Sequence, residues 1–285
     1  MNDMNSIRLI ALDIDGTLLG EDQRFSSGNR KAVERAIGKG VEVVPATGRA
    51  FSALPQEFSG PDAIRGVRYS ITSNGAALSE IETGELIYSK CISAEGLESV
   101  RPLLEDTEIA CEIFHNGVAY VSRADYDEFS ESGLPEGYIR YYLNTRVPVP
   151  RLEVFIREWQ REIESINLIF ADPRKRVKVR EELKSNALVY TMSSLPFNLE
   201  IGAPGMNKGE TLSYLCSVLN IRRDETLACG DNDNDIEMIK FAGIGVAMGQ
   251  GTEGAKAAAD FVTLSNDEDG VAHAIEKFVL RRDGM

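Results

Sequence analysis

The sequence predicts an α/β protein with a three-layer core around a mostly parallel sheet and an inserted α+β domain. Three observations lead to this prediction. Short apolar runs alternate with helical segments at both ends of the chain, several of these runs end in polar, turn-rich peptides, and the alternation is interrupted in the middle. We expect residues 1–88 and 201–285 to form the core and residues 89–200 to form the inserted domain.

The first core segment is expected to begin with a buried strand. The helix predicted for residues 28–39 has apolar residues at helical spacing and is followed by Gly40, a common helix stop. The strands expected in this segment are 9–12, 41–45 and 69–72, and a hairpin is expected from 77–79 and 86–88. The strands end in polar peptides, which is typical of a sheet whose functional edge lies at the strand ends.

The last core segment returns to the alternating pattern, whereas the inserted domain mixes helices and strands. After residue 202 we expect helices at 211–219, 236–241, 252–258 and 270–280, and strands at 226–229, 244–248 and 261–264. In the inserted domain we expect helices at 94–104 and 152–166, strands at 110–114, 118–122 and 187–192, and loop or short helix at 125–142. The simplest account is one α/β core built from both ends of the chain.

Size, charge and cysteine usage narrow the class of protein. A chain of 285 residues is long enough that two domains are expected. The net charge of −14 argues against nucleic acid and anionic membranes as partners. The sequence has no apolar run near the ~18 residues of a membrane span, no secretory signal, and 4 cysteines without metal or disulfide spacing. We therefore expect a cytoplasmic protein with reduced thiols, and we make no prediction of its oligomeric state.

Two aspartates follow the first predicted strand directly, in the peptide Asp13-Ile14-Asp15-Gly16. In an open parallel sheet, ligands bind at the carboxyl ends of the strands, and glycine lets the backbone turn sharply there. Two carboxylates about 4 Å apart repel by roughly 4 kcal/mol at an effective dielectric near 20. A cation is expected to offset this repulsion, and hard oxygen ligands favour Mg²⁺.

A second acidic cluster, Gly230-Asp231-Asn232-Asp233-Asn234-Asp235, also follows a short apolar strand. It is not an EF-hand loop, because Ile236 stands at the sixth position and Ala242 at the twelfth. Taken alone, the cluster is typical of a solvated acidic loop. Because Asp13 and Asp15 occupy an equivalent strand end, we expect both clusters to face one crevice.

Two further features suit an anionic ligand. Thr47-Gly48 offers a hydroxyl and backbone N–H groups at a predicted strand-to-helix turn. Lys208 precedes a predicted helix, in a segment that lacks the glycine a Walker A loop has directly before its lysine. The glycines of 243–249 have the wrong spacing for a dinucleotide fingerprint. Carboxylates, a lysine and an anion-binding turn together indicate phosphoryl transfer, in which a carboxylate attacks phosphorus and another acts as acid and base.

In these motifs the chain resembles the haloacid dehalogenase (HAD) superfamily phosphatases, and among them the Cof-type group. The resemblance is carried, in order and at the family's spacing, by Asp13-Ile14-Asp15-Gly16-Thr17-Leu18, Thr47-Gly48-Arg49, Ser73-Asn74-Gly75, Lys208-Gly209 and Gly230-Asp231-Asn232-Asp233-Asn234-Asp235. It implies a Rossmann-like core with an inserted α/β cap of the C2B type. It also implies a Mg²⁺-dependent phosphatase acting on a small phosphorylated metabolite, such as a sugar phosphate or a phosphorylated cofactor.

The resemblance also implies roles for individual residues. Asp13 is the implied nucleophile, and Asp15 is the implied general acid and base. The implied phosphate-binding residues are Ile14, Thr47, Gly48, Lys208 and Asn234, the implied metal ligands are Asp13, Asp15 (through its backbone carbonyl) and Asp231, and Asp235 supports a metal-bound water. One departure is Met248-Gly249-Gln250-Gly251, where the family usually has Met-Gly-Asn-Ala.

Two other functions are compatible with the same motifs. A phosphomutase would share the first half-reaction but return the phosphoryl group to a sugar, and it would require a bisphosphorylated activator. A regulatory protein that only binds phosphate or metal would be expected to have lost catalytic groups, whereas Asp13, Asp15, Lys208 and Asp231 are all present. The substrate itself is expected to be selected by residues of the inserted domain, where no motif identifies them.

Overall fold

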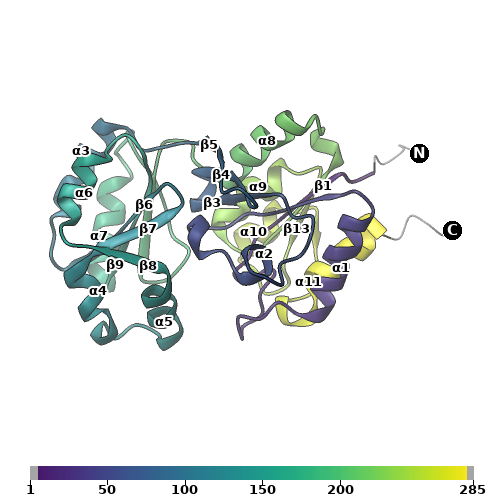
Figure 1. Cartoon of the computed structure of the whole chain (residues 1–285), viewed down its shortest axis with the longest axis horizontal. Coiled ribbons are helices and arrows are strands. Elements are labelled where there is room, and N and C mark those ends of the chain that lie inside the picture. Colours follow the sequence, from purple (N-terminus) through teal and green to yellow (C-terminus); the bar gives the residue numbers. More distant parts are fainter. Residues whose placement is uncertain (1–5, 281–285) are drawn as a thin grey trace. The chain divides into compact units, whose positions relative to one another are not determined.

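The computed structural model describes residues 6–280, which form two compact units (Figure 1). We call the first the core unit. It contains the chain up to Gly48, the segment Leu54–Tyr88 and the chain from Asn207 onward. We call the second the inserted unit, and it contains Arg49–Ala53 and Ser89–Met206. Within residues 6–280, no helix is long and apolar enough to cross a membrane.

A parallel sheet forms the centre of the core unit. Its strands are β1 (Leu9–Leu12), β2 (Glu42–Pro45), β12 (Thr226–Gly230), β13 (Ile244–Ala247) and β14 (Phe261–Val262). They lie in the order β14-β13-β12-β1-β2, and every pair is parallel. The fold class predicted from the sequence is confirmed. Because β1 lies between β12 and β2, with Leu12 opposite both Cys229 and Pro45, the residues that follow these three strands emerge together.

Helices cover both faces of this sheet. They are α1 (Ser27–Gly38), α2 (Gln56–Ser59), α8 (Lys208–Leu219), α9 (Ile236–Phe241), α10 (Glu253–Ala258) and α11 (Gly270–Ile275), with a π-helical turn at Glu276–Leu280. Helices α8 and α9 pack on the face that carries Leu9 and Ala11. Helices α1 and α11, purple and yellow in Figure 1, lie side by side, and the Asn29 side chain accepts a hydrogen bond from the Ala272 N–H at 2.9 Å.

A smaller sheet continues the core unit beyond β2. It consists of β3 (Tyr69–Thr72), β4 (Ala77–Glu80) and β5 (Leu86–Ser89), in that order. These match the predicted third strand and hairpin. However, β3 pairs antiparallel with β4, and among the described residues its strand pairing with the parallel sheet is an isolated bridge between Ala46 and Ile71. The predicted third strand is therefore not a full member of the parallel sheet.

The inserted unit is built on a mainly antiparallel sheet. Its strands are β6 (Ile109–His115), β7 (Val118–Ser122), β8 (Arg146–Val149), β9 (Ile163–Phe170), β10 (Tyr190–Met192) and β11 (Asn198–Gly202). Their order is β10-β11-β9-β6-β7-β8, and β7 and β8 are the parallel pair. Its helices are α3 (Ala94–Leu104), α4 (Arg123–Glu128), α5 (Glu136–Thr145), α6 (Leu152–Glu158) and α7 (Pro173–Leu183).

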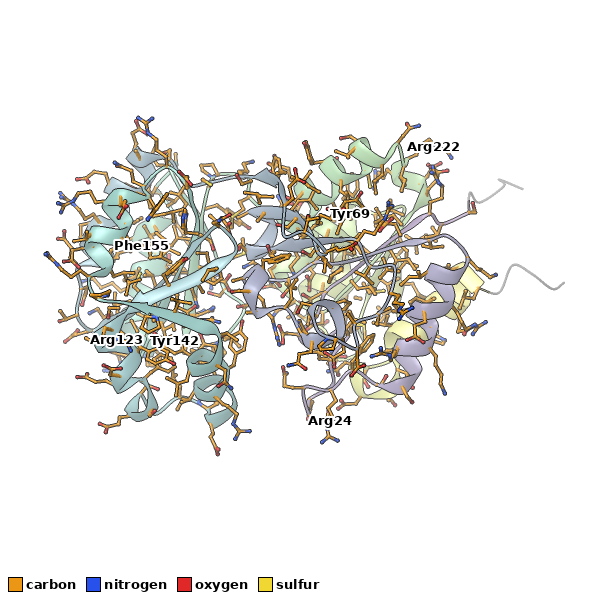
Figure 2. All side chains as sticks on the ribbon, in the orientation of Figure 1. Arg24, Tyr69, Arg123, Tyr142, Phe155 and Arg222 are labelled. Atoms are coloured by element: carbon orange, nitrogen blue, oxygen red, sulfur yellow. The ribbon has the colours of Figure 1, made fainter. Side chains whose placement is uncertain are left out.

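The two faces of this sheet differ in polarity. One face carries apolar side chains, including Cys111, Ile166 and Leu199, and packs under α3, α6 and α7. Phe155 of α6, labelled in Figure 2, packs against the same core. The opposite face carries a polar row, because Glu112 and Asn167 are paired across β6 and β9, and Asn167 and Glu200 across β9 and β11. This alternation follows from the two-residue period of a strand.

Several expectations for the middle of the chain are wrong. The helix predicted for 152–166 ends at Glu158, and its last four residues belong to β9. The segment 125–142, expected to be loop or short helix, does contain parts of the short helices α4 and α5, whereas β8, α7 and β11 were not predicted. Strand β11 runs to Gly202 within the inserted sheet, so residues 201–206 belong to the inserted unit and not to the core. Residues 49–53 also belong to it, because the Ser52 N–H bonds to the Gly117 carbonyl at 2.8 Å.

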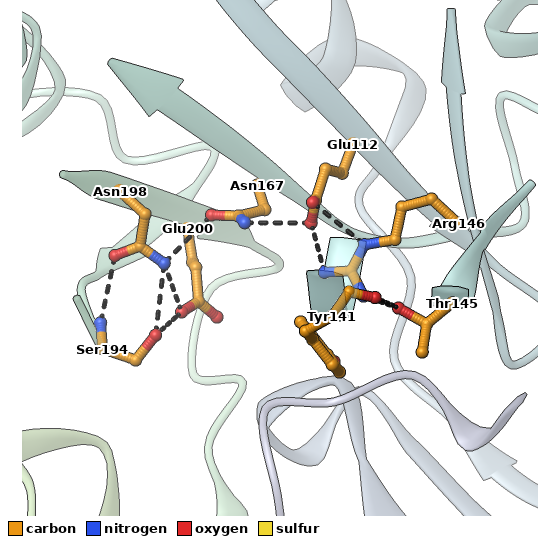
Figure 3. A network of polar contacts seen from close by, with 8 residues as sticks. All are labelled: Glu112, Tyr141, Thr145, Arg146, Asn167, Ser194, Asn198 and Glu200. Carbon is orange, nitrogen blue, oxygen red and sulfur yellow. Dashed lines mark hydrogen bonds and ion pairs between the residues drawn. The ribbon is translucent and has the colours of Figure 1, made fainter. Parts of the chain in front are cut away.

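A buried ion pair joins α5, β6 and β8 in the inserted unit. Figure 3 shows the Arg146 guanidinium against Glu112, with Nε–Oε1 at 3.0 Å and Nη2–Oε2 at 2.9 Å. Asn167 Nδ2 donates to the same carboxylate at 3.0 Å, and the Tyr141 ring lies 4.5 Å from the guanidinium. Both charged side chains are buried. Two-point pairing with further hydrogen bonds is the arrangement that offsets the desolvation of both charges.

We expect Glu112→Ala to destabilise the protein by about 3–5 kcal/mol, because it leaves the Arg146 charge buried without its carboxylate. Urea unfolding followed by circular dichroism measures this. The exposed pair of Arg140 and Glu136 provides the control, and Glu136→Ala is expected to have a far smaller effect. Glu112→Leu combined with Arg146→Met should unfold at higher urea than Glu112→Ala. Equal midpoints for Glu112→Ala and Glu136→Ala would contradict the role of the buried pair.

Candidate active site

The turn after β1 carries the first pair of aspartates. The Asp13 N–H donates to the Cys229 carbonyl at 3.0 Å, so the parallel pairing continues one residue beyond the strand. Asp13 is buried, whereas Asp15 is exposed in the turn. Gly16 has φ +83, and a Cβ there would lie 2.6 Å from Asp231 Oδ2. Glycine at this position therefore lets the turn lie directly against the second acidic cluster.

The loop after β12 is held by its own aspartate. Asp235 lies at the end of the 3-10 turn Asp233–Asp235, and its Oδ2 accepts hydrogen bonds from the N–H groups of Asp231 and Asn232, both at 3.0 Å. Thr17 Oγ1 donates to Asp231 Oδ1 at 3.0 Å. These bonds fix the direction of the Asp231 carboxylate toward the turn after β1.

Lys208 joins the two acidic clusters. It is the first residue of α8, whose N-cap Asn207 accepts a hydrogen bond from the Glu210 N–H at 2.8 Å. Its side chain is completely buried, and Nζ lies 2.6 Å from Asp13 Oδ1 and 2.6 Å from Asp235 Oδ1. The lysine thus places a positive charge between carboxylates that belong to opposite ends of the chain.

This cluster has more acidic groups than basic groups. Burial, together with the nearby charge of Asp235, raises the pKa of Asp13 well above its usual value, against the opposing effect of Lys208. Burial and Asp235 also raise the pKa of Asp231 to about 6. Burial alone would lower the pKa of Lys208, but the charges of Asp13 and Asp235 outweigh it and raise this pKa. One ammonium group therefore does not balance three carboxylates.

The three carboxylates are suited to hold a metal ion. One oxygen from each of Asp13, Asp231 and Asp235 lies within 4.8 Å of the others. Such hard oxygen donors suit a small divalent cation. Asp235 already uses one oxygen for Lys208 and the other for two backbone N–H groups, so Asp13 and Asp231 are the better direct ligands. A divalent cation here would balance the excess negative charge.

A second group of polar residues lies at the ends of β2 and β3. Thr47 is buried, and its N–H donates to the Ile71 carbonyl at 2.9 Å. Asn234 Nδ2 donates to Asn74 Oδ1 at 2.9 Å. A Cβ on Gly48 would lie 3.1 Å from the Asn74 amide. Asn74 therefore brings Gly48 and Asn234 together, two of the residues to which the resemblance gives phosphate binding.

Sequence reasoning gave no role to two residues of this region. Asn74 belongs to the motif Ser73-Asn74-Gly75, in which the Asn-Gly pair is a sequence signal for backbone with positive φ. Gln250, at the position that departs from the family, donates to the Gly16 carbonyl and accepts from the Asn266 N–H at 3.1 Å. Ile14 is buried, and its carbonyl accepts from the Leu19 N–H at 2.9 Å. Gln250 and Ile14 thus both contribute to the turn that carries Asp15.

Comparisons with known proteins show what this chain is similar to. The sequence profile of the haloacid dehalogenase-like hydrolases matches residues 10–275. The chain is 32% identical over 277 residues to the 5-amino-6-(5-phospho-D-ribitylamino)uracil phosphatase YcsE of Bacillus subtilis, covering 96% of each chain. It is similar to the structure of a haloacid dehalogenase-like hydrolase from B. subtilis, with TM-score 0.81, 28% identity and coverage of 96% and 100%. It is also similar to a sugar phosphatase of HAD subclass IIB, with TM-score 0.77, 28% identity and coverage of 95% and 98%.

Proposed function

Because the chain belongs to the haloacid dehalogenase-like hydrolase family, we propose that it is a Mg²⁺-dependent phosphatase of small phosphorylated metabolites. The observation that carries this proposal is the contact of Lys208 with both Asp13 and Asp235, next to Asp231. A buried lysine among three carboxylates offers a nucleophile, a positive charge and a cation site in one place. A sugar phosphate and the phosphorylated pyrimidine named for the B. subtilis relative are the first substrates to consider.

In the proposed reaction, a carboxylate oxygen of Asp13 attacks phosphorus and the bond from phosphorus to the leaving alkoxide breaks. Asp15, exposed in the turn two residues further on, donates its proton to the leaving oxygen. The product of this half-reaction is an aspartyl phosphate on Asp13. Water then attacks phosphorus and gives a proton to Asp15, while the bond from phosphorus to the Asp13 oxygen breaks. This step releases inorganic phosphate and restores both carboxyl groups to their starting states.

The surrounding residues are proposed to hold Asp13 and the phosphoryl oxygens. Lys208 orients Asp13 through the 2.6 Å contact and offers positive charge to the transferred group. Thr47 and the backbone at Ile14 and Gly48 offer a hydroxyl and N–H groups to the remaining oxygens, and Asn234 offers its amide. Asp235 keeps Lys208 and the loop of Asp231 in place.

The metal is proposed to be Mg²⁺, held by the carboxylates of Asp13 and Asp231 and by the Asp15 carbonyl, with Asp235 supporting a bound water. The close approach of Gly16 to Asp231 supports this set, because a Cβ on Gly16 would lie 2.6 Å from Asp231 Oδ2 and the peptide that follows Asp15 therefore lies near that carboxylate. When bound, Mg²⁺ would neutralise charge on the phosphoryl oxygens and on the cluster.

We further propose that the inserted unit is the cap that selects the leaving group, and that the core unit carries the chemistry. One face of the sheet in the inserted unit packs under three helices, and on the other face Asn167 and Glu200 are buried in a hydrogen-bonded network. This proposal is supported by the place of Asp13, Lys208 and Asp231, which all belong to the core unit and leave the inserted unit without the reacting groups.

A panel of phosphorylated metabolites, with released inorganic phosphate as the readout, tests the proposed function. We expect phosphate release from at least one sugar phosphate or from the phosphorylated pyrimidine. Chelation with EDTA should abolish it, and Mg²⁺ should restore it. The alternative phosphomutase would require a bisphosphorylated activator and would isomerise its substrate without accumulating phosphate. No turnover in the presence of Mg²⁺ and retained phosphate binding would instead indicate a binding protein.

A further inference from the structure

We propose that Asn74 is a positioning residue that holds the amide of Asn234 and the loop at Gly48 in place to bind the phosphoryl group. The inference rests on the proposed function, because it gives Asn74 a role in binding the same phosphoryl group. It assigns a role to a side chain outside the proposed catalytic, phosphate-binding and metal-binding residues.

The turn Ser73–Gly75, which we call the left-handed turn, has an unusual backbone. Its φ values are +51 at Ser73, +55 at Asn74 and +93 at Gly75, and all three residues are buried. Left-handed backbone costs free energy at residues other than glycine, and such residues persist where the surrounding structure requires them. A buried run of three such residues beside the proposed site therefore indicates a function that the conformation serves.

The backbone of the left-handed turn has its own structural contacts. The Asn74 N–H donates to the Thr47 carbonyl at 3.0 Å, and the Gly75 carbonyl accepts from Thr211 Oγ1 at 2.6 Å. A Cβ on Gly75 would lie 2.3 Å from the Asn207 carbonyl oxygen and 2.8 Å from the Lys208 nitrogen. The turn thus packs against the end of β2 and against the start of α8, which carries Lys208. These contacts use backbone atoms and do not require an asparagine side chain.

The Asn74 side chain makes the contacts that the backbone does not explain. Its Oδ1 accepts the 2.9 Å hydrogen bond from Asn234 Nδ2. Its amide also lies beside Gly48, because a Cβ built on Gly48 would be 3.1 Å from the amide nitrogen and oxygen of Asn74. Because an amide can rotate about its terminal torsion, fixing one N–H of Asn234 leaves the other N–H with a defined direction. The Asn74 side chain thereby lowers the conformational entropy that is lost when the phosphate-binding groups become ordered on binding.

The competing explanation is that asparagine occurs here only because it tolerates left-handed backbone. Asn74→Gly separates the two explanations, since glycine adopts this backbone more easily and lacks the amide. Asn220→Gly is the matched control. Asn220 also has left-handed backbone, with φ +51, but it caps the far end of α8 and is exposed.

The experiment compares kcat and KM for the best substrate of the panel, together with inhibition by inorganic phosphate. If Asn74 positions Asn234, Asn74→Gly should lower kcat/KM by about tenfold, mainly through KM, and should weaken phosphate inhibition similarly. The melting temperature should stay close to that of the unchanged protein. Asn220→Gly should leave all of these quantities unchanged. A merely structural role would alter the melting temperature without this rise in KM.

A double-mutant cycle tests whether Asn74 acts through Asn234. Asn234→Ala should also raise KM, and adding Asn74→Gly to it should change kcat/KM by less than about twofold. Full additivity of the two substitutions would overturn the proposed route. Kinetics of Asn74→Gly equal to those of the active unchanged protein would overturn the inference alone. If the unchanged protein neither hydrolyses a phosphate ester nor binds inorganic phosphate, the proposed function fails and the inference falls with it.

Discussion

Asp13→Asn is expected to abolish turnover of every phosphate ester that the protein hydrolyses, with a fall in kcat on the order of 10⁴-fold or more. Asparagine has nearly the same shape but no anionic oxygen to attack phosphorus, so no aspartyl phosphate forms. The substitution also removes a negative charge from the cluster, while Lys208 keeps its 2.6 Å contact with Asp235. The protein is therefore expected to remain folded, and steady-state phosphate release measures the effect.

Asp233→Asn is the matched control for this experiment. Asp233 lies in the second acidic motif, but it is exposed, and its Oδ1 accepts a hydrogen bond from Thr252 Oγ1 at 3.0 Å. An asparagine there can still accept this bond, so activity should stay within about twofold of the unchanged protein. Retained turnover in Asp13→Asn would disprove the assignment of the nucleophile. Equal losses in both variants would show that the acidic loop acts through its overall charge.

Lys208→Met should affect both activity and stability. Methionine has a similar length, but it leaves Asp13 and Asp235 buried without the ammonium group that contacts both. We expect kcat/KM to fall by about 10²–10³-fold, because positive charge at the transferred phosphoryl group is lost. We expect the metal-free protein to lose about 3–5 kcal/mol of stability, since breaking a buried ion pair leaves an uncompensated charge. Kinetic assays and urea unfolding in EDTA measure these two effects.

Lys240→Met provides the comparison for this variant. Lys240 is exposed and pairs with Glu237 on the surface of α9, so its removal should leave activity unchanged and stability nearly so. Adding Mg²⁺ should recover part of the lost stability of Lys208→Met, because a cation can replace some of the missing positive charge. Full activity and an unchanged unfolding midpoint in Lys208→Met would disprove the proposed role of this lysine.

The core elements and the family could be predicted from the sequence because their signals are local. Strands β1 and β3 and helix α9 have the predicted bounds, since each is a short apolar run or an amphipathic segment flanked by turn residues. The ordered motifs indicated the HAD superfamily, and the family profile confirms this over residues 10–275. A strand followed by a glycine and carboxylates can be recognised from a few neighbouring residues, without knowledge of the rest of the fold.

The inserted unit could be predicted less well because its polar residues are buried. Residues 163–166 of β9 were assigned to a helix, although Asn167 in the same strand pairs with Glu112 and Glu200 across the sheet. Polar residues in the middle of a strand are stabilised by partners that are distant in the sequence. The local pattern does not contain these partners, so it did not distinguish a buried polar strand from a helix.

The types of chemical group in the candidate site could be predicted from the sequence, because aspartates, a lysine and turn residues follow predicted strands. The meeting of these groups at one place could not be read from the sequence and required the tertiary structure. Asp13 and Lys208 are 195 positions apart, and they meet because α8, which begins at Lys208, packs on the sheet face that carries Leu9 and Ala11 of β1. The left-handed backbone around Asn74 likewise persists because of contacts with the ends of β2 and α8. Pairing between distant strands and the packing of α8 on the sheet set these positions, so the geometry of the site follows from folding of the whole core unit.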